Sequence, residues 1–341
     1  HGGNDQSLEI ETAHGAGFRG RPARASIPKL CASCHANEQR MRAYNLPVDQ
    51  YALYQTSGHG RLLAKGDTRV AVCSDCHGVH DILPPSDPAS RVYRTNIPRT
   101  CGRCHGDQRL MPAAKAVYAE YQGSIHATEL IERGNLRAPT CVSCHGVHGA
   151  APPALGDVDK VCGQCHTAER RYLMAGAHHS GGNGKGVECS QCHDAHGIQV
   201  AQPNRYAVMC LRCHAAGTPE ATLGRRMWTE YRTASEEVDH AMAAAAKADA
   251  VPINTEDYRA RLEEARTYLR EALPAAHAVR EYVVAGLAAR ARSVAAEVQS
   301  DIHGKLSNLR VRKFVLIVVW FYLLLTIFIL RRFQKRAAGK A

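Results

Sequence analysis

Every cysteine of this chain belongs to one repeated pattern, C-x-x-C-H. The pattern occurs seven times in 341 residues and uses all 14 cysteines. Two thiols at this spacing can form thioether bonds with the two vinyl groups on one edge of a porphyrin, and the histidine that follows can bind the iron from one side. The pattern therefore predicts seven covalently bound c-type haems.

The predicted haem residues fall into two sets. The thioether cysteines are Cys31, Cys34, Cys73, Cys76, Cys101, Cys104, Cys141, Cys144, Cys162, Cys165, Cys189, Cys192, Cys210 and Cys213. The proximal iron ligands are His35, His77, His105, His145, His166, His193 and His214.

Other chemistry of paired cysteines fits this pattern less well. Structural zinc sites need no histidine directly after the second cysteine, and seven pairs do not divide evenly into four-cysteine sites. A thioredoxin-like redox motif would occur once, beside a βαβ pattern. Seven disulfides between cysteines three residues apart are also disfavoured.

Two further histidine patterns repeat together with the cysteine motifs. A Tyr-x-x-Ser-x-His segment lies at 54–59 and again at 121–126, each time between two motifs, and a longer segment at 172–180 carries two adjacent histidines. The second motif of each pair is followed by another histidine, as in CSDCHGVH and CVSCHGVH. The chain thus reads as three two-haem modules and one last haem. We expect the porphyrins to form the hydrophobic core, because 31–214 offers little protein for each cofactor.

The additional histidines are candidates for the distal position on each iron. His80 lies too close to His77 to reach the opposite face of the same haem, so we expect it to bind a neighbouring iron. The same argument applies to His148 and His196. The other candidates from the repeated segments are His59, His126 and either His178 or His179. A seventh distal ligand stays open among His1, His14, His240, His277 and His303.

An uncharged apolar run near the C-terminus predicts a transmembrane helix. Residues 314–330 read FVLIVVWFYLLLTIFIL, which is at the short end of the length needed to span a bilayer. Cationic residues flank both ends, and the larger cluster, at 331–336, is C-terminal. The positive-inside rule therefore predicts a cytoplasmic C-terminus and a periplasmic haem region. A buried core helix is the alternative interpretation.

The compartment and the charge agree with this arrangement. Covalent haem attachment takes place outside the bacterial cytoplasm, and we expect the chain, which begins at His1, to be a mature form without its signal peptide. The formal net charge is +11, but two propionates on every haem would offset it. Arginine and lysine are then better explained by propionate pairing than by nucleic-acid binding, which we do not expect.

The predicted fold class is mainly α and irregular, with the haems as the core, followed by a C-terminal helical hairpin and one transmembrane helix. We expect two long helices at 222–248 and 255–300, with Pro274 as a possible kink in the second. The predicted domains are an extended arm at 1–26, a seven-haem domain at 27–221, a helical hairpin or stalk at 222–310, a transmembrane helix at 311–332 and a cytoplasmic tail at 333–341.

The motifs, the CHGVH strings and the Tyr-x-x-Ser-x-His segments resemble the class III-like multihaem cytochromes c over residues 27–214. The resemblance implies haems with two histidine ligands, closely stacked and used to conduct electrons. The chain is also similar to membrane-anchored tetrahaem quinol dehydrogenases, but those have an N-terminal anchor and four haems, so their chemistry does not carry over. The helices after the last motif loosely resemble those of the hydroxylamine oxidoreductase group.

We therefore expect a heptahaem electron carrier in the bacterial inner membrane, within a respiratory or photosynthetic complex. Its expected partners are the bilayer, a membrane quinol-oxidising subunit of cytochrome b type or similar as donor, and a soluble periplasmic cytochrome or reductase as acceptor. The alternative is a multihaem reductase in which one haem lacks a distal ligand and binds nitrite, hydroxylamine or a sulfur oxyanion. The seventh haem has the least certain distal ligand and is where such a site would be sought.

Overall fold

The computed structural model describes residues 2–4, 6–111, 117–154, 157–179, 186–200 and 202–338. Over these residues the chain consists of helices, turns and irregular segments, without a strand, in agreement with the predicted fold class. It divides into two compact units. The first is His1–Cys165 with Val187–Ala201, and the second is His166–Gly186 with Gln202–Ala341.

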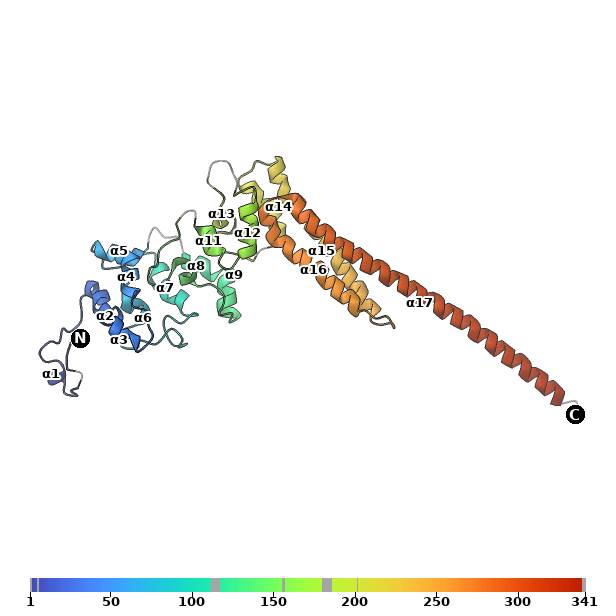
Figure 1. Ribbon diagram of the computed structural model, residues 1–341, viewed down its shortest axis with the longest axis horizontal. Coiled ribbons are helices and arrows are strands. Elements are labelled where there is room, and N and C mark those ends of the chain that lie inside the picture. Colours follow the sequence, from blue (N-terminus) through green and yellow to red (C-terminus); the bar gives the residue numbers. More distant parts are fainter. Residues whose placement is uncertain are drawn as a thin grey trace. The chain divides into compact units, whose positions relative to one another are not determined.

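The first unit is built from short helices joined by turns (Figure 1). In chain order they are α1 (Ile10–Ala13), η1 (Arg24–Ser26), α2 (Ile27–His35), α3 (Glu38–Arg42), α4 (Gln50–Thr56), α5 (Gly58–Ala64), α6 (Cys73–His77), α7 (Ile97–His105), α8 (Val117–Gln122), α9 (Ile125–Ala127), the π-helical turn η2 (Thr128–Glu132), α10 (Cys141–His145), α11 (Val158–Cys162) and α13 (Cys189–His193).

Most cysteine motifs lie on helices, and their spacing explains why. Residues i, i+3 and i+4 share one helix face, so both thiols and the histidine of C-x-x-C-H point to the same side. Helices α6, α10 and α13 consist of the motif alone, whereas α2 and α7 end with it. Both α2 and α7 begin with Ile-Pro, and Pro28 and Pro98 are buried in the first turn, where the missing N–H costs no helical hydrogen bond.

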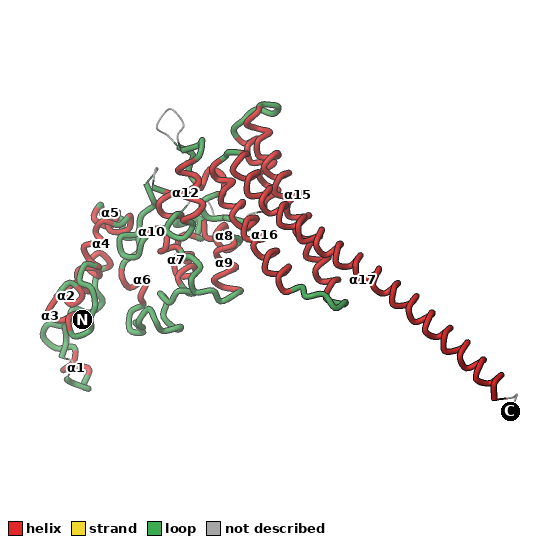
Figure 2. Tube along the Cα trace, turned by 45° about the vertical axis from the view of Figure 1, so that its right-hand side comes forward, coloured by secondary structure: helices red, strands yellow, loops and turns green. Residues whose placement is uncertain are grey.

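The second unit ends in a bundle of long helices (Figures 1 and 2). Its elements are α12 (Thr167–Ala175), η3 (Pro203–Arg205), α14 (Tyr206–Met209), η4 (Cys210–Arg212), α15 (Pro219–Ala248), α16 (Glu256–Ala275), η5 (Ala276–Ala278) and α17 (Glu281–Ala338).

The bundle core is unusually rich in alanine. On α15 the buried positions are Ala234, Val238, Ala241, Ala245 and Ala248, which alternate in steps of four and three. The same steps recur on α16 and on the first half of α17. This is a heptad repeat, as in coiled coils, and the small side chains let the three helices approach closely.

The expected single helix over 255–300 is in fact two helices. Helix α16 ends at Ala275, just after Pro274, and Val279 takes a left-handed conformation (φ 52°) before α17 begins. Proline has no N–H to continue a helical ladder, so the chain turns here and α17 packs back against both α15 and α16. The region is therefore a three-helix bundle instead of a hairpin.

Helix α17 continues far past the ends of its two partners (Figures 1 and 2). Between Val311 and Leu330 almost all its large apolar side chains are exposed. By length and composition, the stretch 281–332 is long and apolar enough to cross a membrane, and its most apolar window is not buried against protein. The helix is compatible with a membrane anchor, because soluble proteins rarely expose so large an apolar surface to water.

Candidate haem-binding sites

Four histidine pairs carry the geometry of the candidate sites. In each pair a histidine of a cysteine motif faces a histidine from elsewhere in the chain. The ring centroids are 6.0 Å apart for His59 and His105, 6.1 Å for His77 and His148, 6.0 Å for His145 and His196, and 6.3 Å for His178 and His214.

This separation suits two imidazoles bound to opposite sides of one iron. A histidine nitrogen binds a transition metal at about 2.0–2.1 Å, so two such rings place their centroids roughly 6 Å apart. The ring planes are nearly parallel in three pairs, at 12–17°, and are tilted by 59° in the first pair. Rotation about the metal–nitrogen bond permits either arrangement. The residues present therefore fit a haem with two axial histidines.

The first cysteines of the two motifs in one module lie next to each other. Cys31 and Cys73, Cys101 and Cys141, and Cys162 and Cys189 lie close enough for the two thiols to change each other's pKa. Before attachment, the neighbouring Cys73 lowers the pKa of the Cys31 thiol to about 7, and the same contact raises the pKa of Cys73. Each module thus brings the attachment points of its two predicted haems together.

The two histidines of a facing pair, by contrast, come from different modules. His59 belongs to the first module and faces the first motif of the second, whereas His148 belongs to the second module and faces the second motif of the first. His196, from the third module, faces the second motif of the second module. The histidine after the second motif of the second and of the third module therefore faces the second motif of the module before it.

The tyrosine and serine of the Tyr-x-x-Ser-x-His segment have structural roles. The Tyr54 hydroxyl donates a 2.9 Å hydrogen bond to the carbonyl oxygen of Ala71, two residues before the next cysteine motif. Tyr121 does the same to Pro139, at 2.8 Å. Ser57 accepts a hydrogen bond from the N–H of Gly60 and so caps the helix that carries His59. The segment therefore positions both a candidate ligand and the cysteine motif that follows it.

The backbone takes a positive φ directly after the histidine of each second motif. Gly78 and Gly146 follow the motif histidine with φ of 89° and 83°, and Asp194 holds the equivalent position at 63°. Such φ values favour glycine, and a residue other than glycine is uncommon there. Two residues after this position, His148 faces His77 and His196 faces His145. That these histidines bind another iron stays a prediction.

One backbone hydrogen bond recurs where modules meet. The N–H of Gly58, directly before His59, donates to the carbonyl of Ala150 at 3.0 Å. At the next junction the N–H of Ile125, directly before His126, donates to Ile198 at 2.8 Å. Both acceptors lie two residues after a distal candidate, His148 or His196. This hydrogen bond joins the two segments that carry the candidate distal histidines where two modules meet.

Burial keeps the facing histidines in the form that can bind a metal. Desolvation lowers the pKa of His77, His148, His178 and His196, which favours the neutral imidazole. The Nδ1 atom of His145 lies 3.1 Å from the carbonyl oxygen of Ala151. A backbone acceptor at Nδ1 leaves Nε2 for the iron, the usual outer-shell arrangement of ligating histidines.

The remaining histidine candidates lie in varied surroundings. His126 is half-buried at the start of α9, and His80 is exposed; their assignment as ligands stays a prediction. Next to His178, His179 is exposed. His1 lies outside the described residues.

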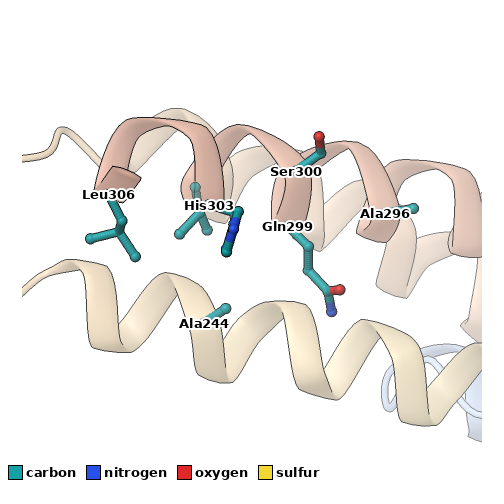
Figure 3. A pocket seen from close by; sticks show the side chains of 7 residues that line it. Ala244, Ala296, Gln299, Ser300, His303 and Leu306 are labelled. Atoms are coloured by element: carbon teal, nitrogen blue, oxygen red, sulfur yellow. The ribbon is translucent and has the colours of Figure 1, made fainter. Parts of the chain in front are cut away.

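Three further histidines proposed for the seventh position have other surroundings. His14 stacks on Phe18, with centroids 4.0 Å apart. His240 is exposed on α15. His303 lines a cavity of about 520 Å³ between α15 and α17, with Ala244, Gln299 and Leu306 (Figure 3).

The first unit has too small an apolar core to hold itself together. Of its described residues, only Met41, Val72, Ala127, Leu130 and Ala138 are buried hydrophobic side chains. Small domains without a sufficient core need covalent or cofactor support. A set of porphyrins enclosed by the helices would supply that missing apolar interior.

Comparison with known proteins agrees with this chemistry. No solved structure matches the chain. Residues 68–167, which carry the motifs from Cys73 to His166, match the model of a family described as cytochrome c3. The match supports covalently bound c-type haems and a multihaem cytochrome c in this part of the chain.

Proposed function

We propose that the chain is a membrane-anchored heptahaem cytochrome that carries electrons. The observation that carries the proposal is the set of four histidine pairs whose centroids lie 6.0–6.3 Å apart. A haem iron with two axial histidines changes oxidation state without offering an open coordination position to a substrate. The chain's own contribution is to hold the histidines in facing pairs and to place the cysteines of each module side by side.

The count of seven haems follows from the seven complete motifs. His178 and His214 give the last motif the same type of facing pair as the earlier motifs. That pair argues against the alternative of a substrate-binding seventh haem. By repetition of the pattern set by His59, His126 is a further candidate distal ligand.

The cellular arrangement is also part of the proposal. Exposed apolar side chains on α17 after Val311, followed by Arg331, Arg332 and Lys335, favour an anchor with a cytoplasmic C-terminus and haems in the periplasm. The expected donor is a quinol-oxidising membrane subunit of cytochrome b type or similar, and the expected acceptor is a soluble periplasmic cytochrome or reductase.

Mass spectrometry and electron paramagnetic resonance together test this function. We expect the intact protein to carry one haem mass for each cysteine motif, and the ferric protein to show low-spin signals alone. Carbon monoxide and cyanide should bind at substoichiometric levels. A high-spin signal from one haem in seven, with ligand binding of the same stoichiometry, would favour the reductase instead.

A further inference from the structure

The third module has a junction contact that matches those of the first two. The N–H of Ala177, directly before His178, donates a 3.2 Å hydrogen bond to the carbonyl oxygen of Ala278. In the earlier junctions the equivalent donors are Gly58 and Ile125, which directly precede His59 and His126. Ala278 therefore takes the place that Ala150 and Ile198 take before it.

The approach at this third junction is close. A Cβ atom on Gly176 would lie 2.7 Å from the oxygen of Ala278 and 2.9 Å from its Cα atom. Such distances exclude any larger residue unless the backbone moves. The segment of the third module is thus fitted to the turn between α16 and α17.

That turn carries a histidine at nearly the position that the repeat requires. In the earlier junctions the carbonyl acceptor lies two residues after His148 or His196, and here it lies one residue after His277. The last motif, at 210–214, has no second motif after it in this chain, so the repeat itself supplies no further histidine of this kind. At this junction the corresponding histidine is His277, from the helical bundle.

The surroundings of His277 suit a metal ligand. The side chain is half-buried, in η5. Its Nδ1 atom lies 3.0 Å from the carbonyl oxygen of Pro274, so Nδ1 can donate there and leave Nε2 for a metal. His145, in a cysteine motif, has the same kind of backbone acceptor at Nδ1.

We propose that His277 is an axial haem ligand, filling the role that His148 and His196 fill for the modules before it. The proposal rests on the proposed function, because it requires haems with two axial histidines. Its consequence is that α17, which begins just after His277 at Glu281, is connected to a redox centre at one end and to the bilayer at the other.

Substitution of His277 tests the assignment in the full-length, haem-loaded chain. In His277→Ala we expect all seven haems to remain attached, because the thioethers are unaffected, and one haem in seven to become high-spin and bind carbon monoxide. Added imidazole should restore the low-spin spectrum. His240→Ala is the matched control, because His240 is an exposed histidine of the same bundle, and it should leave the spectrum unchanged.

A second variant keeps the test valid if the alanine variant fails to fold. In His277→Met we expect one haem to stay low-spin with a higher reduction potential, since methionine ligation raises the potential of a c-type haem. An unchanged potential and a wholly low-spin His277→Ala protein would overturn the assignment. A wild-type protein that already contains a high-spin haem would instead count against the proposed function, so the two failures are distinguishable.

Discussion

Tyr54 and Tyr121 illustrate how single residues can position a candidate haem site without being iron ligands themselves. Each hydroxyl donates to a carbonyl just before the next cysteine motif, while a serine three residues later caps the helix with the ligand. Burial is the largest cause that raises the pKa of both tyrosines to about 12. Their neutral forms are therefore held in the folded protein over the whole physiological range.

Replacement of either tyrosine by phenylalanine should lower stability in a pH-dependent way. At neutral pH we expect Tyr121→Phe to cost about 1 kcal/mol in the free energy of unfolding, the usual value of one hydrogen bond. The folded pKa lies above the unfolded pKa of about 10, so this stabilisation is present below pH 10 and is lost as the pH rises through 12.

Urea unfolding at neutral pH and between pH 10 and 12 measures this difference. Tyr44→Phe is the control, because the Tyr44 side chain is 71% exposed, and it should change stability little at either pH. A constant difference between wild type and Tyr121→Phe across this range would contradict the role assigned to the hydroxyl.

At the scale of elements, the three-helix bundle depends on alanine at its heptad positions. Ala241 and Ala245 on α15 are almost fully buried against α16 and α17. Small side chains there permit close contact between helices, and the same contact holds the first half of α17 in place. The bundle thus holds the first half of a helix whose second half is exposed over almost all of its described residues.

Enlarging a buried alanine should loosen the bundle. We expect Ala241→Leu to destabilise it by about 1–3 kcal/mol, because overpacking forces the helices apart. Ala243→Leu, at an exposed position of the same helix, should be nearly neutral. Thermal unfolding followed by circular dichroism compares the two, and equal melting temperatures would show that the alanine spacing is not required for packing.

At the scale of the whole molecule, the chain combines a unit that has little apolar core with a unit that has its own core. Most of the described buried hydrophobic side chains belong to the second unit, whereas the first has facing histidines and adjacent cysteines. We therefore expect folding of the first unit to require haem attachment, and the bundle to fold by ordinary hydrophobic packing.

Removal of residues 311–341 should separate the anchor from the electron-transfer function. We expect the shortened protein to leave the membrane fraction with its full haem content and unchanged reduction potentials, because the haem ligands all precede Val311. Cell fractionation, haem staining and redox titration measure the three properties. Retention of the shortened chain in the membrane would show that another surface provides the anchor.

Local chemistry could be predicted from the sequence because it depends on residues close together in the chain. The cysteine spacing, the paired motifs and the apolar run at 314–330 are all short-range patterns. The match of residues 68–167 to the cytochrome c3 family agrees with the interpretation of these patterns as haem chemistry. The same patterns left the direction of ligand exchange open, as well as the choice between His178 and His179.

The tertiary structure decided what depends on distant segments. It brings His148 against His77 and His178 against His214, and it turns the chain after Pro274 so that three helices pack where two were expected. The physical reason is the same in both cases. A thioether motif is determined by residues that are neighbours in the sequence. A second axial ligand or a helix partner comes from elsewhere in the chain, so only the folded structure determines which residue occupies that position.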